Sequence, residues 1–299
     1  MATRVDFRRV LESLADSTEL ITLEAEGSPL VERVREAVAD GADLVVAAGG
    51  DGTVRDVATA LVGTVTPLGI VPLGTFNNFA RSLNIPMDPT AAWQVILKGQ
   101  IRRVDVGLAN DKHHFFEAAG IGVDADLFPV GEEIKRGHFT ALIQGVRLAL
   151  AHQPSRLELR FDRSLARAYT ASYVGQSALT RRRRRFQSLK RQTRLRCSFI
   201  AVANGPYYGG NFTISPNAVL DDGLFSIAVF RDFSRTELLR HFWSISRGRR
   251  QYNPKLEMFV AARLEVSAPK PLSVHVDGVP IGQTPARFAV LPRALSVLV

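Results

Sequence analysis

The first hundred residues alternate between helix-like and strand-like patterns of apolar positions. Apolar residues recur at helical spacing in one set of segments and form short continuous runs in another. Helices are expected over residues 7–16, 28–40, 53–61, 75–83 and 88–97. Strands are expected over residues 19–25, 44–48 and 68–71. Strands separated by helices of this length predict an α/β domain with a mostly parallel sheet.

After about residue 106 the pattern changes to strand-like runs with few helices. Strands are expected over residues 114–119, 156–161, 199–203, 224–230, 255–266, 273–276 and 286–291, and helices over 139–151 and 234–244. This pattern predicts a second, mainly antiparallel β domain. We therefore expect an α/β domain over 1–107 and a β-rich domain over 108–299, whose last strand packs back on the first domain. Two such domains favour a binding site in the cleft between them.

A glycine-rich turn follows the apolar run at 45–48. Residues 45–54 read V-V-A-A-G-G-D-G-T-V, so the glycines fall between a strand and the helix expected from Thr53. Glycines let backbone N–H groups approach a ligand closely, and a helix N-terminus favours phosphate. Asp51 adds a carboxylate where a nucleotide-bound cation could sit. A tight strand–helix turn capped by Asp51 or Thr53 explains the same spacing.

The cysteine content indicates the cellular compartment of the protein, and the net charge indicates the kind of partner that it binds. Lys and Arg outnumber Asp and Glu by 38 to 29 in the 299 residues, and the formal net charge of +9 suits an anionic partner. Cys197 is the only cysteine, so a disulfide framework is excluded and a cytoplasmic location fits. The sequence has no zinc-type Cys/His spacing and no apolar run long enough to span a membrane. Membrane contact is therefore expected to be peripheral.

Residues 181–185 are five consecutive arginines, with more basic residues up to 196. Like charges at this density repel one another, so a solvated loop is expected. We expect this segment to be attracted to an anionic membrane surface, where each charge contributes on the order of 1 kcal/mol. Interleaved aromatic residues for base stacking are missing, so nucleic acid is not the expected partner.

A second glycine-bearing turn follows the first by about twenty residues. Residues 72–81 read P-L-G-T-F-N-N-F-A-R. The combination of G-G-D-G-T with P-L-G-T-x-N-x-x-A-R closely resembles the diacylglycerol kinase catalytic domain family, which includes bacterial lipid kinases and the sphingosine kinases. The resemblance continues through V-D-V-G at 104–107, A-A-G-I-G-V-D-A at 118–125, N-G-P-Y-Y-G-G at 204–210, L-D-D-G-L-F at 220–225 and V-D-G-V-P-I-G at 276–282.

The resemblance implies ATP-dependent, magnesium-dependent phosphorylation of a hydroxyl of diacylglycerol or a similar lipid. It also implies an α/β nucleotide-binding domain like that of NAD kinase and phosphofructokinase, followed by a β-sandwich domain. By matching position, the nucleotide would contact Gly49, Gly50, Asp51, Gly52, Thr53, Gly74, Thr75 and Asn77. Asp105 falls on an acidic position of the family near the interdomain cleft and, with Asp51, is a candidate catalytic residue. Asp221, Asp222 and Asn217 fall where the family binds a structural magnesium ion.

The chain departs from the family pattern at four places. The family pattern opens with a strand that leads into an N-P-x-x-G-type loop, and this chain is expected to begin after that loop. Asn78 and Asn217 replace family aspartates. The D-G-E that supplies the general base of the family reads Asp277-Gly278-Val279, and valine cannot accept a proton. Asp277 remains the candidate base, because residues 277 and 279 of a strand would share a face.

Three functions therefore remain open from the sequence. The first is an active lipid kinase, and the second is a catalytically weak or silent member that binds nucleotide or lipid in a regulatory role. The third is an enzyme like NAD kinase or phosphofructokinase, against which the P-L-G-T-F-N-N block and the strand-rich second half argue. A P-loop kinase is disfavoured, since the motif G-x-x-x-x-G-K-[ST] is missing.

Overall fold

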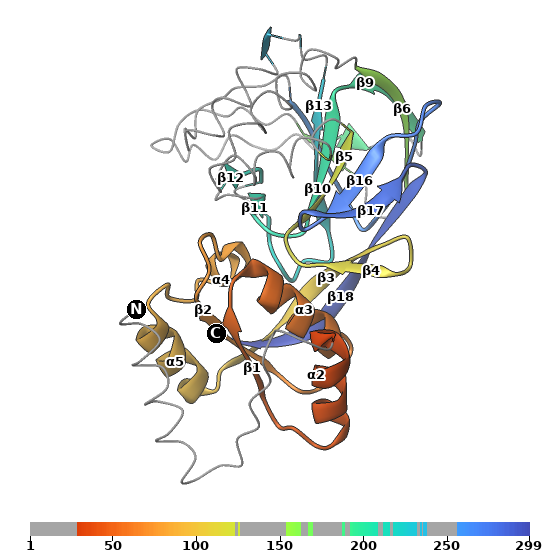
Figure 1. Cartoon of the computed structure of the whole chain (residues 1–299). Helices are drawn as coiled ribbons and strands as arrows, with labels where there is room; N and C mark the ends of the chain where they lie inside the picture. The colour runs from red at the N-terminus through yellow and green to blue at the C-terminus, as the bar shows by residue number, and fades with distance from the viewer. Residues whose placement is uncertain are drawn as a thin grey trace, which may run out of the picture. The chain divides into compact units, whose positions relative to one another are not determined.

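The chain divides into two compact units (Figure 1). Unit 1 comprises residues 1–104 and 293–299, and unit 2 comprises residues 105–292. The computed structural model describes residues 29–122, 125, 154–162, 167–169, 187–188, 192–208, 212–215, 218–231, 234, 236–237 and 256–299. The expected helices over 7–16 and 139–151, the expected strand over 19–25 and most of the expected helix over 234–244 lie outside these residues.

Unit 1 is an α/β layered fold built on parallel strands. Its elements are α2 (Leu30–Ala39), β1 (Val45–Gly49), α3 (Asp51–Leu61), β2 (Leu68–Pro72), α4 (Asn78–Ser82) and α5 (Pro89–Lys98). Strand β1 pairs in parallel with β2, and β2 pairs in parallel with the end of the last strand, β18 (Ala286–Leu298), at Val297. The α/β pattern expected from the sequence is confirmed.

Local signals in the sequence fix the ends of α5. The Asp88 carboxylate accepts a hydrogen bond from the backbone N–H of Ala91 at 2.8 Å, and Pro89 occupies the first helical position. Gly99 ends the helix at φ 68°, a left-handed conformation that glycine adopts without steric cost.

The two faces of the parallel strands are covered by different helices. Trp93 and Ile96 of α5 pack on Val71 and Leu298, with Val46 beside them. Gly69 lies on this same face, and a β-carbon there would come within 2.9 Å of the Ile96 side chain, so glycine lets α5 approach closely. Figure 1 shows α2 and α3 on the other face.

Unit 2 is a sandwich of antiparallel strands. One sheet contains β4 (His113–Phe115), β6 (Ser155–Phe161), β9 (Gln192–Cys197), β15 (Arg263–Ser267) and the unit 2 portions of β3 (Ile101–Ala109) and β18. The other contains β5 (Ala118–Gly122), β7 (Arg167–Tyr169), β8 (Gln187–Ser188), β10 (Phe199–Ala203), β13 (Phe225–Phe230), β14 (Leu256–Ala261), β16 (Ser273–Val276) and β17 (Val279–Gln283). A small pair, β11 (Tyr207–Tyr208) and β12 (Phe212–Thr213), completes the described strands.

Aromatic residues from both sheets meet in the core of unit 2. Phe115 stacks on Phe225 with ring centroids 5.4 Å apart and meets the edge of Phe288 at 6.3 Å. A β-carbon on Gly107 of β3 would overlap the Phe115 ring, which lies over the strand at that point. The glycine of the V-D-V-G motif therefore makes room for a core phenylalanine.

Two of the expected strands of unit 2 are each two strands. The run at 114–119 breaks between β4 and β5, because the backbone N–H groups of Phe116 and Glu117 donate to the Asp277 carboxylate rather than to a neighbouring strand. The run at 255–266 breaks at residue 262, where the chain leaves one sheet as β14 and enters the other as β15. The last strand, expected to end at 291, continues to Leu298.

Candidate functional site

The two glycine-bearing turns of unit 1 follow neighbouring parallel strands. Gly49 at the end of β1 is in register with Pro72 at the end of β2. The backbone N–H of Leu73 donates to the Gly49 carbonyl at 2.9 Å, which extends the pairing beyond the strands. Both turns therefore leave the carboxyl edge of the sheet side by side, where ligands of open α/β sheets bind.

The backbones of the two turns are in direct contact. A β-carbon on Gly74 would lie 2.5 Å from the Gly50 α-carbon and 2.7 Å from the Asn77 side-chain oxygen. A β-carbon on Gly50 would lie 3.2 Å from the Gly74 α-carbon. Neither position admits a larger residue without moving the other turn, so the spacing of both motifs follows from one contact.

Asp51 joins the first turn to the helix that follows the second. Its carboxylate oxygens accept hydrogen bonds from the backbone N–H groups of Asn77 at 2.9 Å and Asn78 at 2.7 Å. The Asn77 side chain in turn bonds both the N–H and the carbonyl of Gly74, each at 2.9 Å. Asn77 has φ 52°, a left-handed conformation that asparagine tolerates, and α4 therefore begins at 78 rather than at the expected 75.

The N-terminus of α3 faces this edge without a side-chain cap. Gly50 is the N-cap residue, and it makes no side-chain cap hydrogen bond. A β-carbon on Gly49 would meet the Thr53 side chain at 2.6 Å, so this glycine is required by packing within the turn. Gly52 has no neighbouring atom within 4 Å of the equivalent position, and Thr75 on the second turn is exposed. The uncapped N–H groups and the positive end of the helix dipole suit an anion.

Unit 2 holds a second polar group around Asp105. This residue of β3 is 1% exposed, and its carboxylate accepts a hydrogen bond from the backbone N–H of Gly223 at 2.7 Å. Its backbone carbonyl accepts one from the Asn204 side-chain amide at 3.0 Å. Asp105 thereby holds the loop at 220–223 against β3, since its backbone N–H also donates to the Leu220 carbonyl.

The Asp221–Asp222 pair lies in that loop. Although the Asp222 side chain is exposed, partial burial of its carboxyl group raises its pKa, and the Asp105 and Asp221 carboxylates raise it further. The Asp105 and Asp221 carboxylates thus repel that of Asp222, a charge arrangement that a cation would relieve. Among the described residues, no group of three or more His, Cys, Asp or Glu side chains has metal-binding geometry. Asn217, the third expected ligand, lies outside the described residues.

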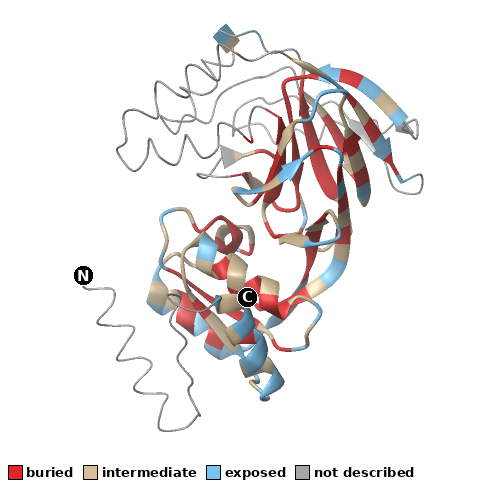
Figure 2. Cartoon of the chain, turned by 45° about the vertical axis from the view of Figure 1, so that its right-hand side comes forward, coloured by how far each residue is buried: buried red, intermediate tan, exposed pale blue. Residues whose placement is uncertain are grey.

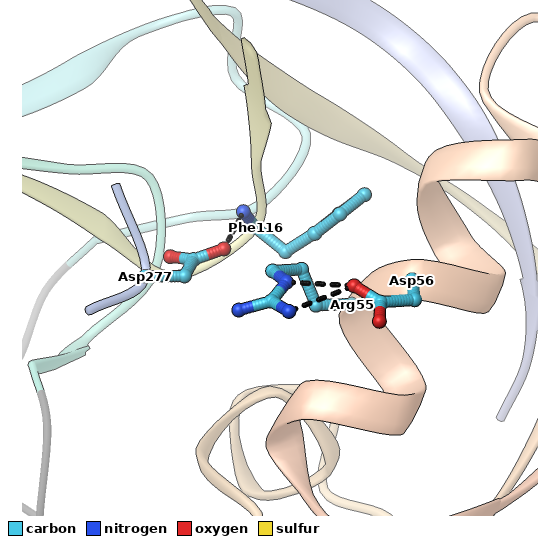
Figure 3. A network of polar contacts seen from close by, with 4 residues as sticks. All are labelled: Arg55, Asp56, Phe116 and Asp277. Carbon is cyan, nitrogen blue, oxygen red and sulfur yellow. Dashed lines mark hydrogen bonds and ion pairs between the residues drawn. The ribbon is translucent and has the colours of Figure 1, made fainter. Parts of the chain in front are cut away.

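Asp277 lies in the hairpin turn between β16 and β17. Its carboxylate accepts hydrogen bonds from three consecutive backbone N–H groups, those of Phe116, Glu117 and Ala118, at 2.8, 3.0 and 3.0 Å. Figure 3 shows the bond to Phe116 and, in unit 1, the ion pair of Arg55 with Asp56 at 2.8 Å. The Asp277 carboxylate therefore provides the hydrogen-bond acceptors for the backbone N–H groups at the break between β4 and β5.

A buried histidine next to this turn was not singled out by the sequence. His275 is 2% exposed, and its Nδ1 accepts a hydrogen bond from the Gly278 N–H, which leaves Nε2 as the donor to the Tyr208 hydroxyl at 2.9 Å. A β-carbon on Gly120 would overlap both of these side chains. Gly120, the first glycine of A-A-G-I-G, was the sequence signal that could have indicated this contact. A glycine inside a strand often marks a place where another group approaches the backbone closely.

Comparison with known proteins identifies both parts of the chain. Residues 2–109 match the diacylglycerol kinase catalytic domain, and residues 160–299 match the YegS C-terminal NAD kinase beta sandwich-like domain. The resemblance to the diacylglycerol kinase catalytic domain family, expected from the motifs, is confirmed by these matches.

Relatives of the family align over most of their length. The chain is 29% identical over 275 residues to a "Probable lipid kinase YegS-like" protein of Klebsiella pneumoniae, covering 90% of this chain and 82% of the relative. It is 27% identical over 291 residues to a "Diacylglycerol kinase" of Staphylococcus aureus, covering 96% and 84%. A crystal structure of a diacylglycerol kinase from Bacillus anthracis shares the fold with a TM-score of 0.62 and 21% identity, over 93% of this chain and 83% of that one.

Asp277 and Val279, the residues considered for the general base, lie at the hairpin between β16 and β17. Asp277 and Gly278 have φ 43° and 79°, so they form the two-residue turn of a hairpin, and Val276 pairs with Val279 across it. Residues 277 and 279 therefore do not share a strand face, contrary to the expectation from the sequence, because Asp277 is not in a strand. Val279 is 40% exposed, and the three N–H donors occupy the Asp277 carboxylate, which argues against a base role.

Two further expectations concern the membrane. Residues 181–185 lie outside the described residues, so their attraction to an anionic surface stays a prediction. In the part of the chain that the structure describes, no helix is long and apolar enough to cross a membrane.

Replacing Asp51 with asparagine is expected to destabilise unit 1. The amide offers one acceptor oxygen where the carboxylate offers two, so one of the N–H groups of Asn77 and Asn78 loses its partner. We expect the free energy of unfolding in urea to fall by about 1–3 kcal/mol. Asp56→Asn is the control on the same helix, because its ion pair with Arg55 is part-exposed and worth less than about 1 kcal/mol. Equal effects of the two substitutions would refute the bridging role.

Replacing Asp277 with alanine is expected to destabilise unit 2 by about 2–4 kcal/mol, since three backbone donors lose a charged acceptor. Asp111→Ala is a matched control, because Asp111 also has positive φ, at 56°, but its side chain is 70% exposed. Any strain of alanine in the left-handed region is then common to both variants. Chemical unfolding that gives the same loss for both would contradict the role assigned to the Asp277 carboxylate.

Proposed function

We propose that this protein transfers the γ-phosphoryl group of ATP to a hydroxyl of diacylglycerol or a similar lipid. The observation that carries the proposal is the contact of the two glycine turns at the uncapped N-terminus of α3. Phosphoryl transfer depends on positioning and charge neutralisation, and a glycine turn at a helix N-terminus offers backbone N–H donors and a positive dipole end to phosphate. Membership of a lipid kinase family supports the choice of a lipid acceptor.

In this proposal the triphosphate lies against the first turn of α3. Backbone N–H groups of residues 51–53 donate to phosphate oxygens, and Gly52 provides the open space that a phosphate needs. Thr53 and Thr75 add hydroxyl donors from the two turns. The Asp51 carboxylate sets the position of both turns through its bonds to the N–H groups of Asn77 and Asn78. Asp51 therefore affects nucleotide binding by holding these turns in place.

Magnesium fits the donor chemistry of the acidic loop in unit 2. Asp221 and Asp222 would hold the ion through carboxylate oxygens, the ligands that Mg²⁺ prefers, and Asn217 would add an amide oxygen. When bound, magnesium would neutralise the negative charge of these carboxylates. Asp105 would keep the loop in place through its bond to the Gly223 N–H.

The second candidate is a catalytically weak or silent family member that binds nucleotide or lipid in a regulatory role. The observation that favours it is the hairpin at 277–279, where the base position holds valine and the neighbouring carboxylate bonds to three N–H groups. Both candidates require nucleotide or lipid to bind, but only the first predicts efficient phosphorylation of a lipid.

Nucleotide binding is tested by placing a negative charge at Gly52. We expect Gly52→Asp to weaken ATP binding at least tenfold in isothermal titration calorimetry, because the carboxylate repels phosphate. The same change should maintain or raise the melting temperature, since an aspartate in the first turn of a helix is stabilising and the position is open.

The control for this test is Val65→Asp, which adds the same charge to unit 1 at an 84% exposed position preceding the opposite end of β2. ATP affinity should be unchanged in this variant. Unchanged affinity in Gly52→Asp as well would remove the α3 turn from the nucleotide site.

Turnover is tested by restoring a carboxylate at the base position. If the missing base limits activity, Val279→Glu should raise phosphorylation of mixed lipids by radiolabelled ATP by about 10²–10⁴-fold. Val279→Gln is the control of equal size that cannot accept a proton, and no gain is expected from it. A gain with glutamine, or none with glutamate, would show that the missing base does not limit the reaction.

A further inference from the structure

Leu73 is an exposed apolar side chain at the edge of the sheet where the two glycine turns meet. The strands of unit 1 include buried stretches, drawn in red in Figure 2, and β2 is buried along its whole length. Leu73 follows β2 directly and is 43% exposed. Single exposed apolar residues are common on protein surfaces, so the position of Leu73 relative to the phosphate donors decides whether it has a use.

The hydrogen-bond ladder fixes the face of the sheet on which the Leu73 side chain lies. The backbone N–H of Leu73 donates to the Gly49 carbonyl at 2.9 Å, so the pairing of β2 with β1 continues through this residue. Side chains two residues apart in a strand lie on the same face. Gly69 and Val71 face Ile96 of α5, so the Leu73 side chain lies on this face too, where α5 no longer covers the strand.

The phosphate donors of the proposed function lie on the other side of the same edge. Helix α3, whose first turn holds Gly52, packs on the face away from α5 (Figure 1). Gly50 and Gly74 touch between the two sides, and Gly74 is next to Leu73 in the chain. A ligand with its phosphates at α3 would therefore reach the Leu73 side chain by crossing this one backbone contact.

The other exposed large apolar side chains in the described part of unit 1 lie elsewhere. Leu44 and Val65 precede β1 and β2, at the opposite edge of the sheet, and Leu97 and Ile101 lie at the end of α5 and the start of β3. Binding sites for small molecules combine apolar walls with a few polar groups that fix the orientation of the ligand. Of this set, Leu73 therefore offers the apolar surface that adjoins the polar turns.

We propose that Leu73 contacts the nucleobase of the bound nucleotide and raises the affinity for a nucleotide above that for bare triphosphate. The choice of a nucleotide rests on the proposed function, in which α3 binds the phosphates. A nucleotide carries its charge at one end and the flat, largely apolar face of a base at the other. This shape matches backbone donors on one side of the sheet edge and an apolar side chain on the other. Contact with the base removes apolar surface of both partners from water.

The test compares ATP with inorganic tripolyphosphate, which has the phosphates but no base, in calorimetric titrations of the full chain with magnesium present. Leu73→Ala is expected to weaken ATP binding about tenfold, because most of the apolar contact is lost, and to leave tripolyphosphate binding within about twofold. Leu73→Phe should bind ATP more tightly than Leu73→Ala, since an aromatic ring stacks on a base. The melting temperatures should stay close to that of the unmodified chain, because position 73 is exposed.

Leu97→Ala is the matched control, because it removes the same atoms at a 55% exposed position on α5, outside the two turns. Both ligands should bind this variant as they bind the unmodified chain. Equal weakening of ATP and tripolyphosphate in Leu73→Ala would show that Leu73 only supports the phosphate turn, and unchanged ATP binding would remove it from the site. ATP binding by Leu73→Phe that is no tighter than by Leu73→Ala would contradict stacking on the base. Each of these results overturns the proposal.

The same titrations distinguish failure of this proposal from failure of the proposed function. If ATP and tripolyphosphate bind alike to the unmodified chain and Gly52→Asp weakens both, the phosphate turn stands and the base contact at Leu73 is overturned. If neither ligand binds, the phosphate site of the proposed function is overturned as well. Weaker co-sedimentation of Leu73→Ala with vesicles of phosphatidylcholine and phosphatidylglycerol, with ATP binding unchanged, would overturn the proposal in favour of a membrane contact.

Discussion

The arrangement of unit 1 depends on one carboxylate and one backbone contact. Gly50 and Gly74 touch because neither has a side chain, and the Asp51 carboxylate bonds to the two N–H groups that begin α4. Hydrogen bonds to a carboxylate are stronger than those between neutral groups, so Asp51 holds the two turns together. A phosphate site made of backbone donors needs such rigidity, because donors that reorganise on binding lose affinity.

Aspartate serves the same physical purpose at three places in this chain. Asp51, Asp105 and Asp277 each accept hydrogen bonds from backbone N–H groups of another segment, and each lies in a motif that the family shares. The N–H groups bonded by Asp277 belong to a break between two strands, where no strand partner is available. In this chain the three aspartates therefore have structural roles, and a loss of activity on their substitution would not by itself assign a catalytic role.

The sequence by itself determined the elements and the motifs. Helical spacing and the two glycine turns predicted the described helices of unit 1 and the strands β1 and β2 to within a few residues, because these signals are local. Tertiary structure decided what the glycines and aspartates contact: Gly50 with Gly74, Gly107 with Phe115, and Asp277 with residues 116–118. It also placed Asp277 in a turn and paired His275 with Tyr208. These contacts join residues as many as 161 positions apart, and no local pattern encodes which distant segment a carboxylate or a missing β-carbon will meet.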